Sequence, residues 1–492
     1  MTEHLPVLLI IIPFLSAPLA LLLRNGRVAF GIALVATWSA LWLAVQLLMQ
    51  VLDVGVISYH IGGWEPPWGI EYRVDALNAF VLLLVALIGA VAAPYMGKSA
   101  AQEIETSKLP AFYSAFLLCF TGLLGITVTG DAFNVFVFLE VSSLSAYALI
   151  AMGRDPRALT AAFRYLIMGS VGATFIVIGI GLMYGMTGTL NMADLAERLP
   201  AVSDTRTVRA AFAFLTVGIS LKLALFPLHL WLPNAYTYAP SAVTSFIAAT
   251  ATKVAVYMLL RFFFTVFGAG FSFDVVQLDW VLLPLALIAI VSMSLVAVFQ
   301  DNVKRSLAYS SVAQIGYMIL GIALVSVSGL TGGIVHLFNH ALMKAALFMA
   351  VGCVMYRVGS TSLERWQGLG KRMPWTMAAF VGAGLSIIGV PSTVGFISKW
   401  YLIVGALEKG WWPVAALVLG SSLLALVYIW RVVEMAYMRP PPDGDTSRAE
   451  APLALLIPTW FLVLLNIWFG LNARLTAGVA RQAAEWLLGG GS

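Results

Sequence analysis

Charged residues are scarce in this 492-residue chain, where Asp, Glu, Lys and Arg together make up 10% of the sequence. Soluble domains carry about 25% charged residues, so a cytosolic enzyme and a nucleic-acid-binding protein are both excluded. Cysteine is scarcer still, because Cys119 and Cys353 are its only two occurrences and both lie inside apolar runs. The chain is therefore not a disulfide-stapled secreted domain, and we interpret both cysteines as packing residues.

What the chain has in abundance is apolar sequence, which makes up 61% of its residues. A helical bilayer crossing needs about 20 residues, and the apolar runs predict an all-α polytopic membrane protein of about 14 transmembrane helices. The first run has no basic stretch before it and no cleavage site, so we expect a crossing and not a removed signal. The predicted helices occupy residues 5–23, 28–51, 74–96, 110–128, 132–152, 158–186, 207–226 with 228–238, 241–267, 280–300, 305–326, 330–356, 374–390 with 392–407, 411–438 and 451–471.

The charges of the loops predict the orientation of the chain. Loops after odd-numbered helices are rich in Lys and Arg, and loops after even-numbered helices are richer in Asp and Glu. Because cytoplasmic loops carry the excess of positive residues, we expect the odd-numbered loops in the cytoplasm and both termini outside. The polar stretch 439–450 is expected to be a cytoplasmic loop. The final stretch 473–488 spaces apolar residues one turn apart, which predicts an interfacial helix.

Ionisable side chains also occur where lipid-facing residues would be expected. A charge at the bilayer centre costs about 2.5–3.5 kcal/mol, so we expect a hydrated or paired path in the interior. The deep cations are lysines, and a desolvated lysine can release its proton whereas an arginine does not. Lysines together with histidines and a glutamate therefore suit a proton relay. The predicted proton-transfer residues are Glu140, Lys222, Lys253, His336, His340, Lys344 and Lys399, with His229 as a further possibility.

Each of these residues has an ordinary alternative. Glu140 could be a buried carboxylate that only joins two helices, and Lys222 and Lys399, near helix breaks, could extend to the membrane surface. The histidines could be satisfied core residues. Further charges are expected to be interface anchors or parts of a loop charge cluster: Arg261, Glu408, Lys409, Arg431 and Glu434 as anchors, and Asp301, Lys304 and Arg305 as the cluster.

Two proline breaks divide the chain into repeats. Pro227 follows Lys222 and Pro391 precedes Lys399, and interrupted helices in corresponding positions are typical of inverted repeats with an ion site at each break. The breaks are five segments apart, so the repeats run in opposite directions, and we expect Gly389 and Gly395 to leave room for water. The predicted regions are 1–109 (helices 1–3), 110–267 (first repeat, helices 4–8), 268–438 (second repeat, helices 9–13) and 439–492 (cytoplasmic loop, helix 14 and interfacial helix).

Metal and nucleotide motifs are missing from the sequence. It contains no Walker sequence, no G-x-G-x-x-G after a strand, no C-x-x-C and no H-E-x-x-H. His336 and His340 have the spacing of a metal-binding pair, but Leu337 and Asn339 supply neither a base nor a third ligand. We therefore expect no metal site and no bound cofactor.

Three motifs carry a resemblance to a known family. They are Ser-Leu-Lys-Leu-Ala-Leu-Phe-Pro-Leu-His-Leu-Trp-Leu-Pro-Asn-Ala-Tyr at 220–236, Asp-Asn-Val-Lys-Arg-Ser-Leu-Ala-Tyr-Ser-Ser-Val-Ala-Gln-Ile-Gly at 301–316, and His-Ala-Leu-Met-Lys at 340–344. Together they resemble the proton-translocating antiporter-like subunits shared by respiratory complex I and the Mrp-type cation/proton antiporters. The stretch 181–194 is most similar to the D-type Mrp subunits, and the resemblance covers nearly the whole chain.

The resemblance implies a function and a setting. It implies that Glu140 pairs with Lys222, that Lys253 connects to the histidine helix, and that Lys399 ends the axis. It also implies a multi-pass subunit of a Na+/H+ antiporter of the plasma membrane, a secondary transporter assembled with A-like and small hydrophobic subunits and requiring no cofactor. The alternative is a proton-pumping subunit of complex I or of a membrane-bound hydrogenase. A third possibility, a structural membrane scaffold, stays open at this point.

Overall fold

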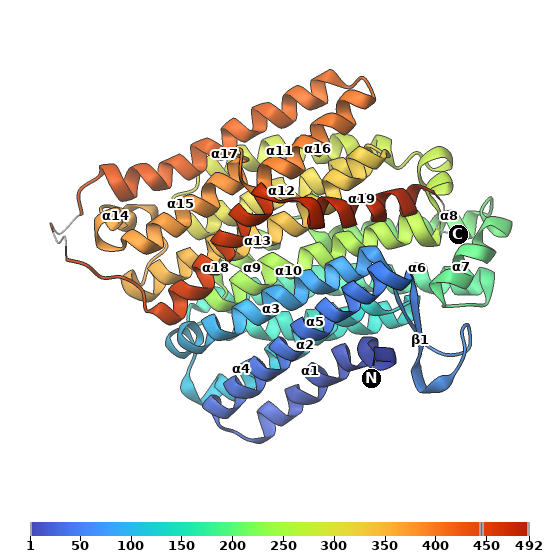
Figure 1. The fold of residues 1–492 in the computed structure, drawn as a ribbon, viewed down its shortest axis with the longest axis horizontal. Coiled ribbons are helices and arrows are strands. Elements are labelled where there is room, and N and C mark those ends of the chain that lie inside the picture. Colours follow the sequence, from blue (N-terminus) through green and yellow to red (C-terminus); the bar gives the residue numbers. More distant parts are fainter. Residues whose placement is uncertain (1, 442–443, 445–446, 490–492) are drawn as a thin grey trace.

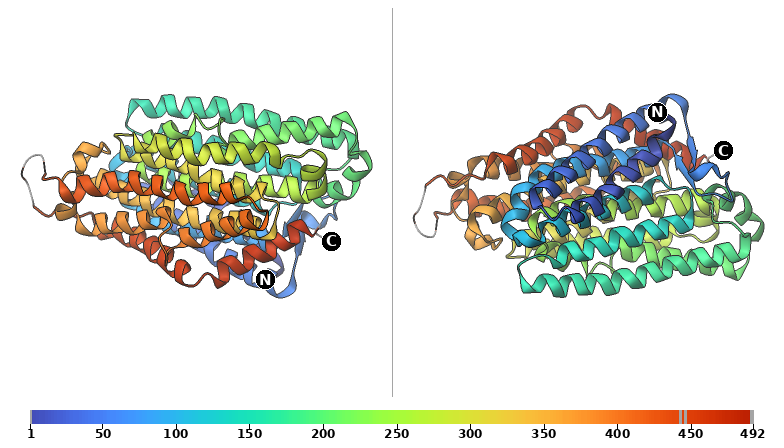
Figure 2. Two further views of the ribbon diagram at one scale, coloured as in Figure 1. Left: turned by 90° about the horizontal axis from the view of Figure 1, so that it is seen from above. Right: turned by 90° about the horizontal axis from the view of Figure 1, so that it is seen from below.

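The computed structural model describes residues 2–441, 444 and 447–489. Long helices lie side by side along one common direction (Figure 1), and turning the molecule shows the same bundle from above and below (Figure 2). Twelve helices in the described chain are long and apolar enough to cross a membrane. They are α1 (Leu5–Leu22), α2 (Gly26–Val54), α3 (Ala76–Glu103), α4 (Leu109–Val128), α5 (Ala132–Ala151), α6 (Pro156–Thr187), α10 (Ser241–Leu260), α11 (Asp279–Val298), α12 (Val303–Ala323), α13 (Val327–Val358), α17 (Trp412–Met438) and α18 (Leu453–Leu471).

Two further crossings are made of broken helices, as the prolines predict. The first is α8 (Arg206–Leu223) followed by α9 (Leu232–Tyr238), and the second is α15 (Pro374–Ile388) followed by α16 (Val394–Glu408). At the breaks, Ala224 and Gly389 have left-handed backbones with φ of 59° and 91°. The all-α polytopic fold with about 14 crossings is therefore confirmed, since each broken pair supplies one crossing.

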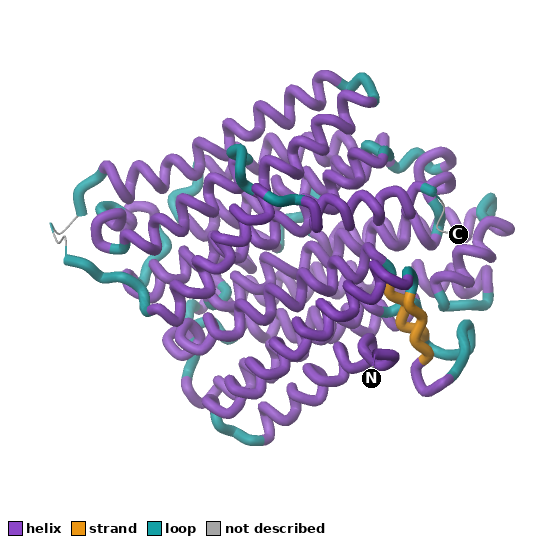
Figure 3. Tube along the Cα trace, viewed as in Figure 1, coloured by secondary structure: helices purple, strands orange, loops and turns teal. Residues whose placement is uncertain are grey.

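Short elements lie at the two ends of the bundle and were not predicted from the sequence. A two-stranded antiparallel hairpin pairs β1 (Ile57–His60) with β2 (Glu71–Val74), with Ile57 opposite Val74, and is the orange pair in Figure 3. Two π-helical segments, η5 (Arg261–Val266) and η6 (Gly270–Val275), follow α10. The other short helices are η1 (Thr2–His4), η2 (Ile61–Gly63), η3 (Thr106–Lys108), α7 (Met192–Arg198), η4 (Leu199–Val202), η7 (Leu363–Trp366) and α14 (Leu369–Arg372).

The two halves of the bundle repeat each other in opposite directions. Helices α6 and α13 each contain 32 residues, and isolated bridges between Asp131 and Asn191 and between Asn302 and Ser362 precede α5 and α12. The two bridges lie at opposite ends of α3. The bridge before α5 is near the start of α3, since the Gly130 amide bonds the Glu71 carbonyl. The bridge before α12 is near the end of α3, since Asn302 and Glu103 line one cavity. The repeat boundaries at 110–267 and 268–438 stay a prediction that this symmetry supports.

Burial separates central helices from peripheral ones. In α10 and α12, 94% of the most apolar window is buried, compared with 39% in α1, α2, α6, α11 and α17. The peripheral helices turn large apolar side chains outward, including Trp38, Trp42 and Trp430. Helix α13 packs against α3, α10, α12, α15, α16 and α18, so it lies at the centre of the bundle. The polar residues of α10, α12 and α13 are therefore placed away from lipid.

The last helix, α19 (Arg474–Leu488), forms at the position expected for an interfacial helix. It packs on α13 and α3 through a face that buries Val479, Ala483 and Leu487. It begins just after α18, whose Gly470 touches the α15–α16 break, and Trp486 near its end lies over Arg261. Contact of its outer face with the membrane surface stays a prediction. The described start of the chain and the end of α19 lie at the same end of the bundle, because His4 packs on Tyr59 of the hairpin that leads into α3, and Trp486 packs on Arg261 beside Asp75.

Candidate functional site

All of the candidate lysines and histidines are buried inside the bundle. Lys253, His336, His340 and Lys344 are 0% exposed, while Lys399, Lys222 and His229 are 4–6% exposed. Neither Lys222 nor Lys399 reaches the surface of the chain, which argues against the snorkelling alternative for both. Because buried charges need partners, the contacts of each group indicate what the site can do.

In the first repeat, Glu140 and Lys222 form an ion pair between α5 and α8. The Glu140 carboxylate lies 3.7 Å from the Lys222 ammonium, and the two side chains are 29% and 4% exposed. The ammonium also donates to the Ser143 hydroxyl at 3.0 Å. A cavity of about 30 Å³ beside the pair is bounded by Tyr165 and by Ala251 of α10. This space is enough for about one water molecule, and it adjoins the helix that carries Lys253.

Lys253 occupies the middle of α10, where it faces the histidine helix. Its ammonium donates to the Ala248 carbonyl at 2.5 Å and to the Thr252 hydroxyl at 3.2 Å. No carboxylate lies within ion-pair distance of Lys253 among the described residues. Helices α10 and α13 pack together, so Lys253 belongs to the helix next to the one that carries His336, His340 and Lys344.

On α13 the expected face of two histidines and a lysine is present. The rings of His336 and His340 stack with their centroids 5.8 Å apart. Lys344 donates to the Leu307 carbonyl of α12 at 2.8 Å and to the Ser310 hydroxyl. Within the described chain, neither ring nitrogen of His340 has a hydrogen-bond partner. Since buried polar atoms are satisfied by protein or by ordered water, the ring nitrogens of His340 are able to bond water.

Lys399 is connected to the histidine helix through two side chains. The Ser398 hydroxyl lies 2.8 Å from Nδ1 of His336. The Tyr317 ring lies 5.4 Å from the His336 ring and 5.2 Å below the Lys399 ammonium. The ammonium donates to the carbonyls of Ile387 at 3.2 Å and Ile388 at 2.8 Å, and to Ser422 at 2.9 Å. Tyr317 was missed in the sequence because a tyrosine in an apolar helix resembles an ordinary core residue.

The candidate residues other than His229 therefore form one series across the bundle. It runs from Glu140 and Lys222 past the cavity to Lys253, then to the face of α13, and then to Lys399. Buried polar atoms of this region have no protein partner in the described chain, namely Nε2 of His336 and the Tyr147 hydroxyl, which lies with the Lys222 ammonium beside Gly169. Groups of this kind can pass protons if water joins them, because lysine, imidazole and hydroxyl groups each donate and accept.

His229 stays outside this series. Its ring stacks on Phe226 with centroids 5.4 Å apart in the α8–α9 break, and Nδ1 lacks a partner among the described atoms. Within the part of the chain that the structure describes, none of its contacts reaches Lys222 or Lys253. The stacking fits a packed residue of the break better than a member of the path.

Three expectations about polar and small residues were wrong. Arg261 is no interface anchor, since it is 7% exposed and its guanidinium lies 2.8 Å from the Asp75 carboxylate. Lys304 does not belong to a loop charge cluster, because it is the second residue of α12 and is 4% exposed. Gly395 leaves no room for water, since a Cβ there would lie 1.8 Å from the Ser386 carbonyl. That glycine instead allows α15 and α16 to touch.

Comparison with known proteins places this arrangement in a family. Residues 129–425 match the NADH:quinone oxidoreductase/Mrp antiporter transmembrane family. The N-type subunit of the NADH-quinone oxidoreductase of Desulforudis audaxviator is 43% identical over 99% of this chain and 100% of its own length. The D-type subunit of the Na(+)/H(+) antiporter of Bacillus subtilis is 30% identical over 98% of this chain and 97% of its own.

A solved structure gives the same result. A chain of the Mrp complex from a Dietzia species superposes with a TM-score of 0.90 at 27% identity, over 99% of this chain and 97% of that one. The family match covers more than half of the chain, and the relatives cover nearly all of it. The chain thus belongs to the NADH:quinone oxidoreductase/Mrp antiporter transmembrane family.

Proposed function

We propose that this chain is the proton-translocating subunit of a multisubunit Na+/H+ antiporter, a secondary transporter of the plasma membrane and not an enzyme. The observation that carries the proposal is the buried series from Glu140 to Lys399, which supplies groups able to gain and lose protons across the width of the bundle. The resemblance to D-type antiporter subunits over nearly the full length supports the same function.

In this function, the proton-transfer residues are Glu140, Lys222, Lys253, His336, His340, Lys344 and Lys399. An opposite charge favours the protonated form of a lysine, so Glu140 controls how firmly Lys222 holds its proton. Water and the hydroxyls of Ser143 and Ser398 connect the longer gaps. We assign the proton path to this chain and leave the sodium path to another part of the complex, because the described helices contain no acidic cluster suited to a dehydrated Na+ ion.

The proposal requires partner subunits and an orientation. The structural relative is a chain of a multisubunit complex, so we expect A-like and small hydrophobic subunits to cover the apolar outer faces of this chain. The positive loops support both termini outside. No cofactor is needed, since every group in the proposed path is a side chain or water.

A second candidate function rests on one observation. The 43% identity to the N-type subunit of an NADH-quinone oxidoreductase favours a proton pump that electron transfer drives. The same buried series serves both functions, because in either case protons move through this chain. The two candidates differ in what the chain assembles with and in what powers transport.

One experiment tests the proposal and separates the candidates. The tagged chain is purified in mild detergent from its own cells, its partners are identified by mass spectrometry, and Na+-dependent collapse of a pH gradient is measured in everted vesicles. An antiporter subunit co-purifies with other antiporter subunits, and Lys222→Ala abolishes the exchange. Co-purification with quinone-binding and iron–sulfur subunits supports the second candidate. Normal exchange by an assembled Lys222→Ala complex removes the proton-path function.

A further inference from the structure

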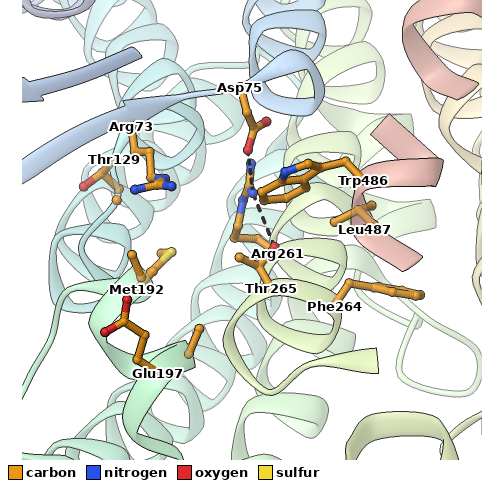
Figure 4. A pocket seen from close by; sticks show the side chains of 13 residues that line it. Arg73, Asp75, Thr129, Met192, Glu197, Arg261, Phe264, Thr265, Trp486 and Leu487 are labelled. Atoms are coloured by element: carbon orange, nitrogen blue, oxygen red, sulfur yellow. Dashed lines mark hydrogen bonds and ion pairs between the residues drawn. The ribbon is translucent and has the colours of Figure 1, made fainter. Parts of the chain in front are cut away.

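Two cavities lie at opposite ends of the same helix pair. Helices α3 and α10 pack together, and Lys253 lies between their ends on α10. At the first end, Asp75 and Arg261 line a cavity of about 420 Å³, called here the Arg261 pocket (Figure 4). At the second end, Glu103 and Lys304 line a cavity of about 490 Å³, called here the Lys304 pocket. Each cavity therefore pairs one acid from the α3 end with one buried base.

The Arg261 pocket is separated from Lys253 by a guanidinium that keeps its charge and by its two hydrogen-bonded neighbours. Figure 4 shows the Arg261 guanidinium directed at Asp75 beside the Trp486 ring. The guanidinium lies 2.8 Å from the Asp75 carboxylate and 5.6 Å from the Trp486 ring centroid. The Tyr257 hydroxyl, one turn nearer to Lys253, accepts from Arg261 at 3.2 Å and donates to the Thr127 carbonyl at 3.0 Å. Arginine stays protonated, so this guanidinium does not take up a proton from the cavity and pass it on toward Lys253.

The local backbone fixes this closure. Asp75 caps the start of α3 by accepting from the amides of Leu77 and Asn78, so its carboxylate is held in place. Arg261 is the first residue of the π-helical segment η5, and such segments often occur at functional sites. Because α3, α10 and α19 all contribute a partner to one guanidinium, the end of the helix pair is held by three elements at once.

The Lys304 pocket is built from groups that can exchange protons. Lys304 is 4% exposed, and among the described residues its ammonium makes one hydrogen bond, to the Ala239 carbonyl at 2.5 Å. Glu103 accepts from the Ser241 amide at 2.9 Å and lines the same cavity as Lys304. The ammonium has three donors, so it keeps donors free for water in the cavity. The other charged residues that line the cavity are Arg154, Asp155, Arg157 and Arg305.

Polar groups of α9 and α10 lie between the Lys304 pocket and Lys253. The Thr244 hydroxyl lies 3.5 Å from the Ala239 carbonyl that Lys304 bonds, and donates to the Tyr236 carbonyl at 2.9 Å. The Thr252 hydroxyl accepts from Lys253 at 3.2 Å, and the buried Tyr236 hydroxyl has no hydrogen-bond partner among the described residues, so it is able to bond water. The Lys253 ammonium also bonds Ala248, which lies on the Ser241 side of it. Lys253 thus points toward the Lys304 pocket and away from Arg261.

We propose that Lys304 and Glu103 form the aqueous mouth through which Lys253 exchanges protons, and that the Asp75–Arg261 pair seals the opposite end. This inference rests on the proposed proton-path function. A releasable cation at one end and a permanent cation at the other give Lys253 access to a single aqueous phase. The loop charges predict that this phase is the cytoplasm.

The test uses the whole complex in everted vesicles, with assembly checked by native gel electrophoresis. Lys304→Arg keeps the positive charge but blocks release, and we expect the initial rate of exchange to fall at least tenfold. Lys304→His restores a releasable proton and is expected to keep at least a third of the wild-type rate. Arg154→Lys is the matched control, since it changes an exposed cation of the same cavity and should leave the rate unchanged.

A second variant examines the sealed end. Arg261→Lys keeps the charge beside Asp75 but makes it releasable, so we expect the passive proton leak of the vesicles to rise severalfold. A merely structural role of Arg261 predicts no such leak in an assembled complex. Exchange at the wild-type rate by Lys304→Arg would show that Lys304 is not part of a proton-exchanging mouth. An unchanged proton leak in Arg261→Lys would show that Arg261 does not seal the opposite end.

Two further arms keep the result interpretable. If the Lys304→Arg complex fails to assemble, the near-isosteric Glu103→Gln variant is tested in its place. If Lys304 and Glu103 form the aqueous mouth, the exchange rate of this variant falls at least threefold. If they do not, the rate equals that of the wild type. Lys222→Ala distinguishes failure of the mouth from failure of the proposed proton-path function. Loss in Lys222→Ala with full activity in Lys304→Arg rejects only this inference, whereas full activity in both rejects the proposed function itself.

Discussion

The two repeats hold their break lysines by different means. Lys222 lies in the last turn of α8 and meets a carboxylate, Glu140, at 3.7 Å. Lys399 lies beyond the other break, in α16, and its ammonium turns back to the Ile387 and Ile388 carbonyls at the end of α15. Both ammonium groups therefore lie at the C-terminal end of a half-helix. At that place the unpaired carbonyls carry partial negative charge.

The difference lies in the partner that each repeat adds. Asp131 caps the start of α5 and Asn302 caps the start of α12, the corresponding helix of the second repeat. Counted from these caps, Ser311 occupies the same position in α12 as Glu140 in α5. Helix α12 therefore carries a hydroxyl where α5 carries a carboxylate. A full negative charge holds a proton on lysine more firmly than a helix end does. The comparison suggests that the first repeat holds its proton while the second passes it on.

Removal of the carboxylate should have the largest effect. Glu140→Gln keeps the shape of the side chain and leaves Lys222 without an opposite charge, so the lysine no longer holds its proton. We expect the exchange rate in everted vesicles to fall at least tenfold, a cost of about 1.4 kcal/mol or more. Glu105→Gln is the control, because Glu105 pairs with Lys108 at 3.1 Å on the surface and such pairs contribute little.

An assembled Glu140→Gln complex with wild-type exchange would make the carboxylate a packing group. The two repeats would then differ in structure but not in function.

The second prediction concerns release from Lys399. Lys399→Arg retains the charge at the end of α15 but cannot give up a proton. If Lys399 is the exit of the path, exchange should fall severalfold to tenfold, measured as the initial rate at matched expression. Lys409→Arg, at the exposed end of α16, is the control. Normal exchange by Lys399→Arg would identify this lysine as a structural anchor. The proton path would then not include Lys399.

The sequence predicted the helices and the deep charges because both are governed by one strong constraint. A backbone inside a bilayer must be helical, and a charge there is costly enough to be rare, so Lys253 and Lys344 stand out without any structural information. The breaks were visible for the same reason, since Pro227 and Pro391 remove backbone donors.

The partners of these charges could not be predicted in the same way. Asp75 and Arg261 lie at the ends of two apolar runs that are far apart in the chain, where an arginine resembles an ordinary anchor. Lys304 stands next to Arg305 in a polar stretch, and it is buried where α12 packs against α9 and its ammonium bonds the Ala239 carbonyl. Gly395 suggested space because it lacks a side chain, yet its backbone is in contact with α15. Such features depend on which helices meet.

The third prediction concerns a carboxylate introduced beside Lys399, which would make the second repeat resemble the first. We expect it to have the smallest effect on the exchange rate. Ser422 carries no charge, but its oxygen lies 2.9 Å from the Lys399 ammonium, close enough for an introduced carboxylate to act as Glu140 does on Lys222. Ser422→Asp should hold the proton on Lys399 and slow exchange by about threefold to tenfold, which corresponds to about 0.7–1.4 kcal/mol. The residue lies on α17 in a half-buried position, so the carboxylate remains partly solvated.

A neutral substitution of the same serine distinguishes charge from space. Ser422→Asn supplies the shape of aspartate without its charge and should change the initial rate of exchange less than twofold. Equal slowing by Asp and Asn would show that space, not charge, matters at this site, and the contrast between the two repeats would lose its electrostatic explanation. Slowing by Asp alone would show that the charge beside each break lysine sets how readily that lysine releases its proton.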